Sequence, residues 1–378
     1  MRILFVDSGD AESVATWSGT TNSILEQLRL KHDVVLLHKL NKWMKYVYAP
    51  YVLQCKIRGL KFQIDRHAMV ARNYASQVEE AYKYCKPDIV FSVSAIPLAH
   101  LPADIPCAMW TDAVMQDMID FYWPSTAYHW RSLDAGKRLD KLALRKNFAS
   151  IFSSKWAADG ARKVAPESSN RIHIVPFGAN SVANPPPQGP RALPGDSAAP
   201  INFLFVGVDW KRKGGQDSVD ALRILRSKGH NVRLSIVGAR PLSDGVDSEF
   251  VRQFGFLDRH IDDEGKLLLR LYKDAHFFIL PTHAECAGIA LAEAASFGLP
   301  IISRNVGGVI STVERNVNSI LIEREEGPEV LAQSIRPLLF DKDRYRAMSE
   351  ASLHLFADRL NWKTAVAKVT DILEKATR

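Results

Sequence analysis

Two adjacent cations and two glycines stand where a predicted strand gives way to a predicted helix. Arg212 and Lys213 precede Gly214 and Gly215 in the segment VGVDWKRKGG. Such glycines let a ligand approach the backbone, the N–H groups of a helix start attract anions, and the cations can neutralise a diphosphate. The G-x-x-x-x-G-K-S/T spacing of a P-loop is missing. We therefore expect a diphosphate-binding turn, with a solvated basic loop as the alternative.

Two glutamates eight residues apart carry a second signal. In PTHAECAGIALAEAASFGLPII, Glu285 lies in a predicted loop and Glu293 lies inside a predicted helix. Their carboxylates should be roughly 10 Å apart, whereas a retaining glycosidase needs its pair about 5 Å apart. We expect two acceptors for hydroxyls at opposite ends of an elongated ligand, although Glu293 alone also fits a partly buried helix charge. Between them, the backbone N–H groups of Ala287, Gly288 and Ile289 can meet a negative oxygen.

Short apolar runs that alternate with amphipathic stretches predict the elements that position these residues. Strands are predicted at 2–7, 33–38, 88–93, 105–111, 150–154, 171–177, 201–207, 232–238, 275–281, 300–303 and 319–323, and helices of the second half at 217–228, 263–273 and 287–297. This alternation is typical of parallel sheets and predicts an α/β protein with two facing Rossmann-like domains. Because ligands bind beyond the carboxyl ends of such strands, we expect the functional loops at a cleft between the domains.

A segment rich in proline and glycine divides the alternation into two similar halves. Residues 184–200 read NPPPQGPRALPGDSAAP, which cannot hold a helix and has little to bury. We predict an N-terminal domain at 1–183, this linker, and a C-terminal domain at 201–360. The final residues, 361–378, are predicted to form a helix that packs back on the N-terminal domain.

The composition is that of a globular protein. The 378 residues are 47% hydrophobic and 24% charged, with a formal net charge of +7. No apolar run approaches the roughly 18 residues of a membrane span, and Asp7 interrupts the first apolar run before a signal peptide could form. Cys55, Cys85, Cys107 and Cys286 form no C-x-x-C pair. We therefore expect reduced thiols, a cytoplasmic location and no structural metal.

The segment 39–61 mixes cations with aromatic and aliphatic residues. Its members are Lys39, Lys42, Lys45, Lys56, Arg58 and Lys61, alternating with Trp43, Tyr46, Tyr48, Tyr51 and Leu60. Such a mixture can rest on an anionic membrane surface, which would place the protein at the inner face of the membrane. The alternative is a solvated helix or loop whose aromatic residues pack on the domain. A nucleic-acid partner is not expected, because the basic excess is modest and no recognised binding motif occurs.

Four motifs of the second half together resemble the GT-B retaining glycosyltransferases of family 4, the glycosyl transferases group 1. They are the strand tip VG…W-x-R-K-G-G, GFLDRH after a strand, the Glu-x7-Glu segment, and the NVGG turn at 305–308. The resemblance covers 201–323 almost continuously. It extends more thinly into the first half through WSGTT, WTDAVMQDM and SSKWAADGA…IHIVPFGAN.

The resemblance implies roles for the matching positions. Arg212 and Lys213 would bind the donor diphosphate, with Gly214 and Gly215 giving it access. Glu293 would accept hydrogen bonds from the ribose. We expect Glu293→Ala and Lys213→Ala to reduce turnover without unfolding the protein.

Further roles follow from the same resemblance. Glu285 and the turn from Cys286 to Ile289 would hold the transferred sugar and part of the phosphate. Gly255 and Leu257 would lie near the nucleotide base, and Gly19 near the diphosphate and the entry of the acceptor.

One position departs from the family pattern. Many members carry a histidine after the strand that corresponds to IPCAMWT, where it contacts the donor sugar, whereas this chain carries Asp112. Asp112 can accept a hydrogen bond from a sugar hydroxyl and so serve a similar purpose; alternatively the site is altered or inactive. His100, His129 and His283 are further candidates for contact with the sugar.

The resemblance implies a retaining, metal-independent enzyme that moves a hexose-like sugar from a nucleoside diphosphate sugar, of UDP or GDP type, to a hydroxyl acceptor. The acceptor would be a glycan, a lipid-linked sugar or a small molecule, in glycan, glycolipid or surface polysaccharide synthesis. The cations, rather than a bound Mg²⁺, would stabilise the departing charge. Two alternatives are a GT-B epimerase or glycan phosphorylase and a catalytically inactive protein that binds sugar nucleotides.

Overall fold

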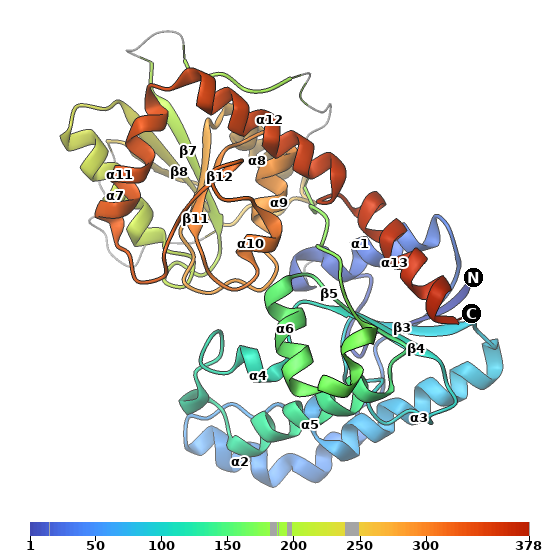
Figure 1. The fold of residues 1–378 in the computed structure, drawn as a ribbon. Helices are drawn as coiled ribbons and strands as arrows, with labels where there is room; N and C mark the ends of the chain where they lie inside the picture. The colour runs from blue at the N-terminus through green and yellow to red at the C-terminus, as the bar shows by residue number, and fades with distance from the viewer. Residues whose placement is uncertain (15, 182–186, 188, 195–198, 239–248, 378) are drawn as a thin grey trace. The chain divides into compact units, whose positions relative to one another are not determined.

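The chain folds into two compact units. The computed structural model describes residues 1–14, 16–181, 187, 189–194, 199–238 and 249–377. Unit 1 comprises Met1–Pro176 and Ala365–Arg378, and unit 2 comprises Phe177–Thr364. In Figure 1 each unit contains one sheet flanked by helices. Both sheets are six-stranded and wholly parallel, which confirms the predicted α/β class with two Rossmann-like halves.

Unit 1 is built on a sheet of order β2-β1-β3-β4-β5-β6. Its strands are β1 (Arg2–Val6), β2 (Asp33–Leu37), β3 (Ile89–Ser92), β4 (Cys107–Thr111), β5 (Ala149–Phe152) and β6 (Ile172–Ile174). Its helices are α1 (Thr20–Arg29), α2 (Ala49–Ile57), α3 (Ala68–Cys85), α4 (Met115–Met118), α5 (Trp130–Lys146) and α6 (Lys155–Val164), with 3₁₀ turns that include η1 (Thr16–Gly19) and η2 (Trp43–Tyr48). All four residues of β3 and of β5 are buried, as expected for strands covered on both faces.

Unit 2 is built on a sheet of order β12-β11-β10-β7-β8-β9. Its strands are β7 (Ile201–Gly207), β8 (Val232–Gly238), β9 (Val251–Gln253), β10 (Phe277–Leu280), β11 (Ile301–Arg304) and β12 (Ser319–Ile322). Its helices are α7 (Gly215–Ser227), α8 (Asp262–Asp274), α9 (Ile289–Ser296), α10 (Val309–Thr312), α11 (Pro328–Ile335) and α12 (Lys342–Asp358). Counted within the unit, the order is the 3-2-1-4-5-6 of a dinucleotide-binding sheet, with its switch point between β7 and β10.

The last helix and the proline-rich segment show how the units divide the chain. Helix α13 (Trp362–Thr377) begins in unit 2 and continues in unit 1, where the Thr370 hydroxyl lies 2.9 Å from His32 Nε2. Within the predicted linker, residues 184–186, 188 and 195–198 lie outside the described residues. Its described part packs in unit 2, because Leu193 is buried in that core and the Arg191 backbone N–H donates to the Ser349 hydroxyl at 2.7 Å.

None of the helices in the described part of the chain has the length and apolar character that crossing a membrane requires. The four cysteines are free and buried. Cytoplasmic location stays a prediction from the sequence.

Candidate functional site

The two turns that carry the predicted phosphate-binding residues meet at the switch point of the unit 2 sheet. Strand β7 pairs with β10 in parallel, so the turns that follow these strands leave the same edge side by side. The first turn leads into α7 and contains Arg212 and Lys213; the second leads into α9 and contains Glu285. Because the chain departs in opposite directions at a switch point, a ligand can enter between such loops.

Two glycines allow close packing at these turns. Gly214 has a φ of +72°, and a Cβ added to it would lie 2.1 Å from the carbonyl oxygen of Pro281. A Cβ on Gly215 would lie 2.1 Å from the ring of Trp210. The predicted reason for both glycines was access for a phosphate, whereas here their missing side chains make room for protein atoms. Their role in donor access stays a prediction.

Backbone hydrogen bonds join the same two turns. The His283 N–H donates to the Arg212 carbonyl oxygen at 2.7 Å, and the Thr282 hydroxyl donates to that oxygen at 3.1 Å. The Arg212 guanidinium in turn donates to the Ala284 carbonyl oxygen at 3.0 Å. The two turns therefore form one bonded structure, in which Arg212 is held at both its backbone and its side chain.

A buried ion pair lies where the turns meet. Lys213 Nζ pairs with a carboxylate oxygen of Glu285, and both side chains are largely buried. Burial alone would raise the pKa of Glu285, but the charge and hydrogen bond of Lys213, the charge of Arg212 and a hydrogen bond from the Gly288 backbone outweigh it and lower the pKa. Glu285 is therefore a carboxylate at neutral pH, suited to accept hydrogen bonds rather than to donate a proton.

The start of helix α9 lies directly beyond this pair. Gly288, the N-cap residue, has a φ of +73°, and no side chain caps the helix. The carbonyl oxygens of this turn are held from the NVGG region, since the Gly308 N–H donates to the Glu285 carbonyl at 2.8 Å and the Thr312 hydroxyl to the Ala287 carbonyl at 2.7 Å. Cys286 and Ala287 are buried. These hydrogen bonds fix the turn before α9. They thereby hold the first N–H groups of the helix, including that of Ile289, in position to meet an anion.

Glu293 lies deeper than a ligand contact requires. It is 2% exposed, and its Oε1 accepts from Arg259 Nη1 at 2.7 Å and from the Ser181 N–H at 3.1 Å. Its Oε2 accepts from the Tyr272 hydroxyl at 3.0 Å. The structure therefore gives Glu293 an internal role, which is to hold Arg259 of the GFLDRH segment. Contact with a ribose stays a prediction, as does the expectation that Glu293→Ala reduces turnover without unfolding the protein. Because Arg259 would lose its partner, we add that this variant should be less stable than the wild type.

The residues predicted near the base follow β9. Gly255 has a φ of +67° with open space around its missing side chain, and its carbonyl oxygen accepts from the Gly238 N–H at 2.7 Å. Leu257 packs against the unit 2 core, whereas Phe256 between them is 68% exposed. Backbone freedom, rather than space, explains the glycine at 255.

A second charged group beside the turns was not predicted from the sequence. Buried Arg304 donates to Asp217 at 2.8 Å and to the Pro281 carbonyl at 2.6 Å. His283 Nε2 lies 3.1 Å from the same Asp217 carboxylate. The basic neighbours lower the pKa of Asp217 against the effect of burial. His283 was predicted as a candidate for sugar contact. The spacing of residues in the sequence gives no indication that Asp217 and Arg304 contact its ring.

The unit 1 candidates also meet one another. Trp17 Nε1 donates to Asp112 Oδ2 at 3.3 Å, which ties the WSG turn after β1 to the residue after β4. Trp17, Ser18 and Gly19 all have positive φ, with values of 49°, 57° and 80°, and Gly19 precedes α1. Of the other candidates, His129 caps α5 by accepting from the Arg131 N–H at 3.3 Å.

One group of possible metal ligands occurs in the described part of the chain, in the segments that follow β1 and β2. It consists of Asp10, Glu12 and His38. Lys39 Nζ lies 3.0 Å from Asp10 and Arg29 lies 3.5 Å from Glu12, so cations of the protein already balance the carboxylates. The group gives no reason to assign a metal.

Comparison with known proteins shows which family the segment that carries this site resembles. The family model described as glycosyl transferases group 1 matches residues 200–341. A D-inositol 3-phosphate glycosyltransferase of Xylanimonas cellulosilytica is 28% identical over 246 residues, which cover 61% of this chain and 57% of the relative. A GDP-mannose-dependent alpha-(1-6)-phosphatidylinositol monomannoside mannosyltransferase of Mycobacterium tuberculosis is 29% identical over 173 residues, covering 43% of this chain and 44% of the relative. The chain thus matches about half the length of these relatives.

Solved structures agree on the fold. A sucrose-phosphate synthase of Thermosynechococcus elongatus aligns with a TM-score of 0.69 at 15% identity, covering 99% of this chain and 98% of the other. The Anabaena protein HepE in complex with UDP-glucose aligns with a TM-score of 0.61 at 15% identity, covering 99% and 100%. These likenesses establish the GT-B fold. Residues 200–341 thus match the glycosyl transferases group 1 model, and the two units together have the GT-B fold.

Proposed function

We propose that this protein is a retaining, metal-independent glycosyltransferase that moves a hexose-like sugar from a nucleoside diphosphate sugar to a hydroxyl acceptor. The observation that carries the proposal is the Lys213–Glu285 pair, with Arg212 beside it, at the switch point and at the uncapped start of α9. Two cations and a helix start offer what a diphosphate requires, and a buried carboxylate offers what a sugar hydroxyl requires.

Charge development in the reaction fits this arrangement. As the bond between sugar and diphosphate breaks, negative charge grows on the leaving phosphate, and Arg212, Lys213 and the N–H group of Ile289 stabilise it. An oxygen of the leaving phosphate takes the proton of the attacking hydroxyl on the same face of the sugar, which retains the anomeric configuration. Glu285 orients the sugar by accepting hydrogen bonds from the sugar hydroxyls. The lowered pKa of Glu285 makes this carboxylate a poor proton donor.

The donor and the acceptor are proposed from the relatives. One relative is named for its dependence on GDP-mannose, and HepE was solved with UDP-glucose, so we propose a UDP or GDP sugar. Relatives are also named for inositol phosphate and, in Staphylococcus aureus, capsular polysaccharide biosynthesis. We propose a polyol or glycan hydroxyl as the acceptor, in glycan, glycolipid or surface polysaccharide synthesis, with Gly19 and Asp112 of unit 1 serving the sugar and the acceptor.

The first test is the shift in thermal midpoint with UDP and with GDP, each with and without Mg²⁺. A ligand that binds only the folded state stabilises it by about 2.7 kcal/mol at one hundred times its Kd. We expect a metal-independent shift with one nucleotide in the wild type, and its loss in Lys213→Met relative to that variant's own unliganded midpoint. Lys211→Met is the matched control, because Lys211 lies in the same turn but is exposed.

The outcomes separate the alternatives. A shift without sugar transfer to any hydroxyl acceptor and without slow donor hydrolysis would favour an inactive binding protein. Conversion of the sugar nucleotide without acceptor would favour an epimerase. Equal shifts in Lys213→Met and the wild type would remove the assigned diphosphate site.

A further inference from the structure

The segment 39–61 of unit 1 separates into a packed side and an exposed side. The packed side holds Tyr48, whose ring centroid lies 4.7 Å from that of His67, and Tyr51, which stacks on Phe62 at 6.1 Å. In α2, all of whose residues the structure describes, Cys55 alone is buried. These contacts, together with the packing of Met44 against the core, hold η2 and α2 on unit 1.

The exposed side is rich in large apolar groups. Trp43 is 58% exposed, Tyr46 70%, Leu53 61% and Ile57 79%. Single exposed apolar residues are ordinary, but a concentration of them in fifteen residues indicates an interaction surface. We name the exposed residues of η2 and α2, with their flanking cations, the η2–α2 face.

The charge of this face has one sign. No Asp or Glu occurs between Asp33 and Asp65. Lys39 and Lys42 lie within 3.0 and 3.6 Å of Asp10 and Asp65, at the margins of the face. Lys45 and Lys56 lie beside its apolar residues and line the same pocket.

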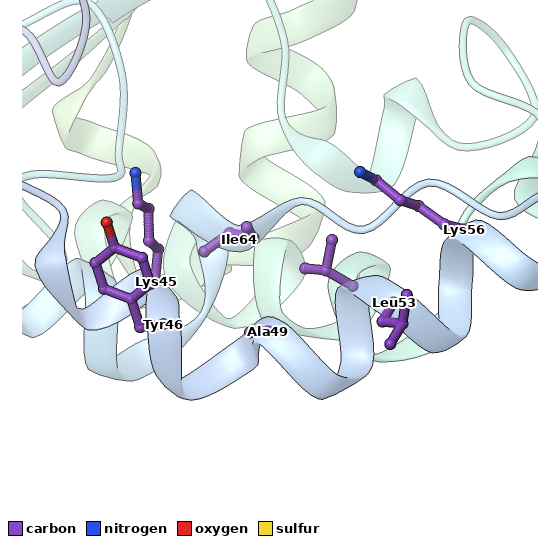
Figure 2. A pocket seen from close by; sticks show the side chains of 7 residues that line it. Lys45, Tyr46, Ala49, Leu53, Lys56 and Ile64 are labelled. Carbon is purple, nitrogen blue, oxygen red and sulfur yellow. The ribbon is translucent and has the colours of Figure 1, made fainter.

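A pocket of about 270 Å³ opens between these two lysines. Figure 2 shows Lys45 and Lys56 at its two ends, with Ala49, Leu53 and Ile64 between them. Ala49, Val52, Leu53 and Lys56 follow the spacing of one side of a helix, so α2 supplies an apolar floor with a cation at its end. The arrangement pairs an apolar trough with cations at its rim.

We propose that the η2–α2 face binds the surface of an anionic phospholipid bilayer. Lys45 and Lys56 contact lipid phosphates, while Leu53, Ile57 and Trp43 lie at the level where headgroups meet acyl chains. Charge complementarity selects an anionic partner, and exposed aliphatic side chains gain nothing from a nucleic acid but do gain from an apolar phase. The nine-residue α2 is far shorter than the roughly 20 residues of a span, so it lies on the bilayer. The proposal is independent of the proposed enzymatic function.

Cosedimentation with vesicles of phosphatidylcholine, with and without phosphatidylglycerol, tests the charged part. We expect binding that requires phosphatidylglycerol and weakens with salt. Lys45→Gln/Lys56→Gln should weaken it about 25-fold, since each cation near such a surface contributes about fivefold. The control Lys368→Gln/Lys375→Gln removes the same charge from exposed positions on the unit 1 part of α13 and should bind like the wild type.

A second pair of variants tests the apolar part. Leu53→Ser/Ile57→Ser should bind about tenfold or more weakly even at low salt, whereas Leu30→Ser, at a residue that is 75% exposed in the same unit, should not. Lys45 is half-buried and the other substituted positions are exposed, so unchanged thermal midpoints will show that the variants fold. Absence of binding at low salt, or equal losses in variants and controls, would overturn the proposal. Self-association of the wild type that Leu53→Ser/Ile57→Ser abolishes, without vesicle binding, would assign the face to a second copy of the chain.

Discussion

The switch-point turns of unit 2 and the η2–α2 face of unit 1 use the same residue types in opposite ways. In unit 2, Lys213 pairs with a buried carboxylate and Arg212 donates to a carbonyl oxygen. On the η2–α2 face, Lys45 and Lys56 border exposed apolar side chains. Charges held by internal partners are preorganised for a small ligand of fixed geometry. An exposed face of cations and apolar side chains suits an extended partner that has no fixed geometry.

The buried carboxyl groups differ between the units as well. In unit 2, cations and N–H groups lower the pKa values of Asp217 and Glu285 despite burial. In unit 1, burial raises the pKa values of Asp117 and Asp140 to about 6. The effect of burial on the carboxyl pKa is thus outweighed at the turns of unit 2, whereas it prevails at Asp117 in α4 and Asp140 in α5 of unit 1.

The largest effect is expected from Glu293→Ala. The change leaves Arg259 without its buried partner and removes the acceptor of Tyr272 and Ser181, so the free energy of unfolding should fall by about 3–5 kcal/mol in urea titration. The unit 1 control is Glu167→Ala, which breaks an ion pair with Arg145 in which both side chains are about half exposed. That variant should change stability little. Similar losses in both would mean that the Glu293 cluster is no more than a surface pair.

Gly214→Ala should come next. It places a Cβ against the Pro281 carbonyl at a position with positive φ, and we expect a loss of about 2–4 kcal/mol in the same titration. The matched change in unit 1 is Gly59→Ala, where φ is +67° and nothing lies within 4 Å of the added atom. Only the backbone term of about 1 kcal/mol should then appear. A loss at Gly214 no greater than that at Gly59 would contradict the close approach of the two turns.

Asp117→Asn should reverse the usual pH dependence. Burial, first, and the nearby Asp140 raise the pKa of Asp117 against the opposing charge of Lys163, and its Oδ2 has no hydrogen-bond partner among the described residues. The stability linked to its proton is complete below the ordinary value of 3.8 and lost as pH rises through about 6. The variant should therefore be more stable than the wild type at neutral pH, and the difference should shrink as the pH falls towards the ordinary pKa of 3.8.

Glu285→Gln in unit 2 provides the opposite sign. Its lowered pKa gives stability that is present above the ordinary value of 4.5 and lost as pH falls through the lower folded value. The Gln variant should be less stable than the wild type at neutral pH and should approach it in acid. The pH profiles are measured by urea unfolding. Parallel profiles for the two variants would show that the pKa values of Asp117 and Glu285 are not shifted in opposite directions.

The smallest effect belongs to Trp17→Phe. Loss of the Nε1–H donor to Asp112 should cost about 1 kcal/mol in the thermal or urea unfolding of the protein. Asp112→Asn retains an acceptor and should stay within a few tenths of the wild-type value. Equal losses would indicate that the charge of Asp112, rather than its hydrogen bond, holds the WSG turn.

The sequence predicts eleven of the twelve described strands, because these contain short apolar runs between turn residues. The apolar runs omit β9, whose sequence is VRQ. The sequence also predicts that Lys213 and Glu285 belong to one site, since parallel strand tips converge at one edge. It does not predict Arg304, which reads as one cation after a strand yet reaches Asp217 and the Pro281 carbonyl. The depth of Glu293 is equally hidden, because residues distant in sequence, Ser181 and Tyr272, cover it.

The 39–61 segment shows the same limit. Its alternation of cations and aromatic residues predicts either a packed or an exposed segment, and both occur. Tyr48 and Tyr51 pack because the rings of Phe62 and His67 lie beside them. Tyr46 and Ile57 are exposed, and nothing in the sequence distinguishes them from the packed residues. Only tertiary placement separates the two groups.

The contact between Gly214 and the Pro281 carbonyl has a consequence for protein engineering. Because the turns after β7 and β10 share backbone hydrogen bonds and leave no room for a Cβ, they form a single exchangeable module. A chimera that takes one turn from a relative and keeps the other would mismatch both the glycine and the carbonyl that faces it. Under the proposed function, donor preference should therefore be transplanted with the two turns together, although about seventy residues of chain separate them.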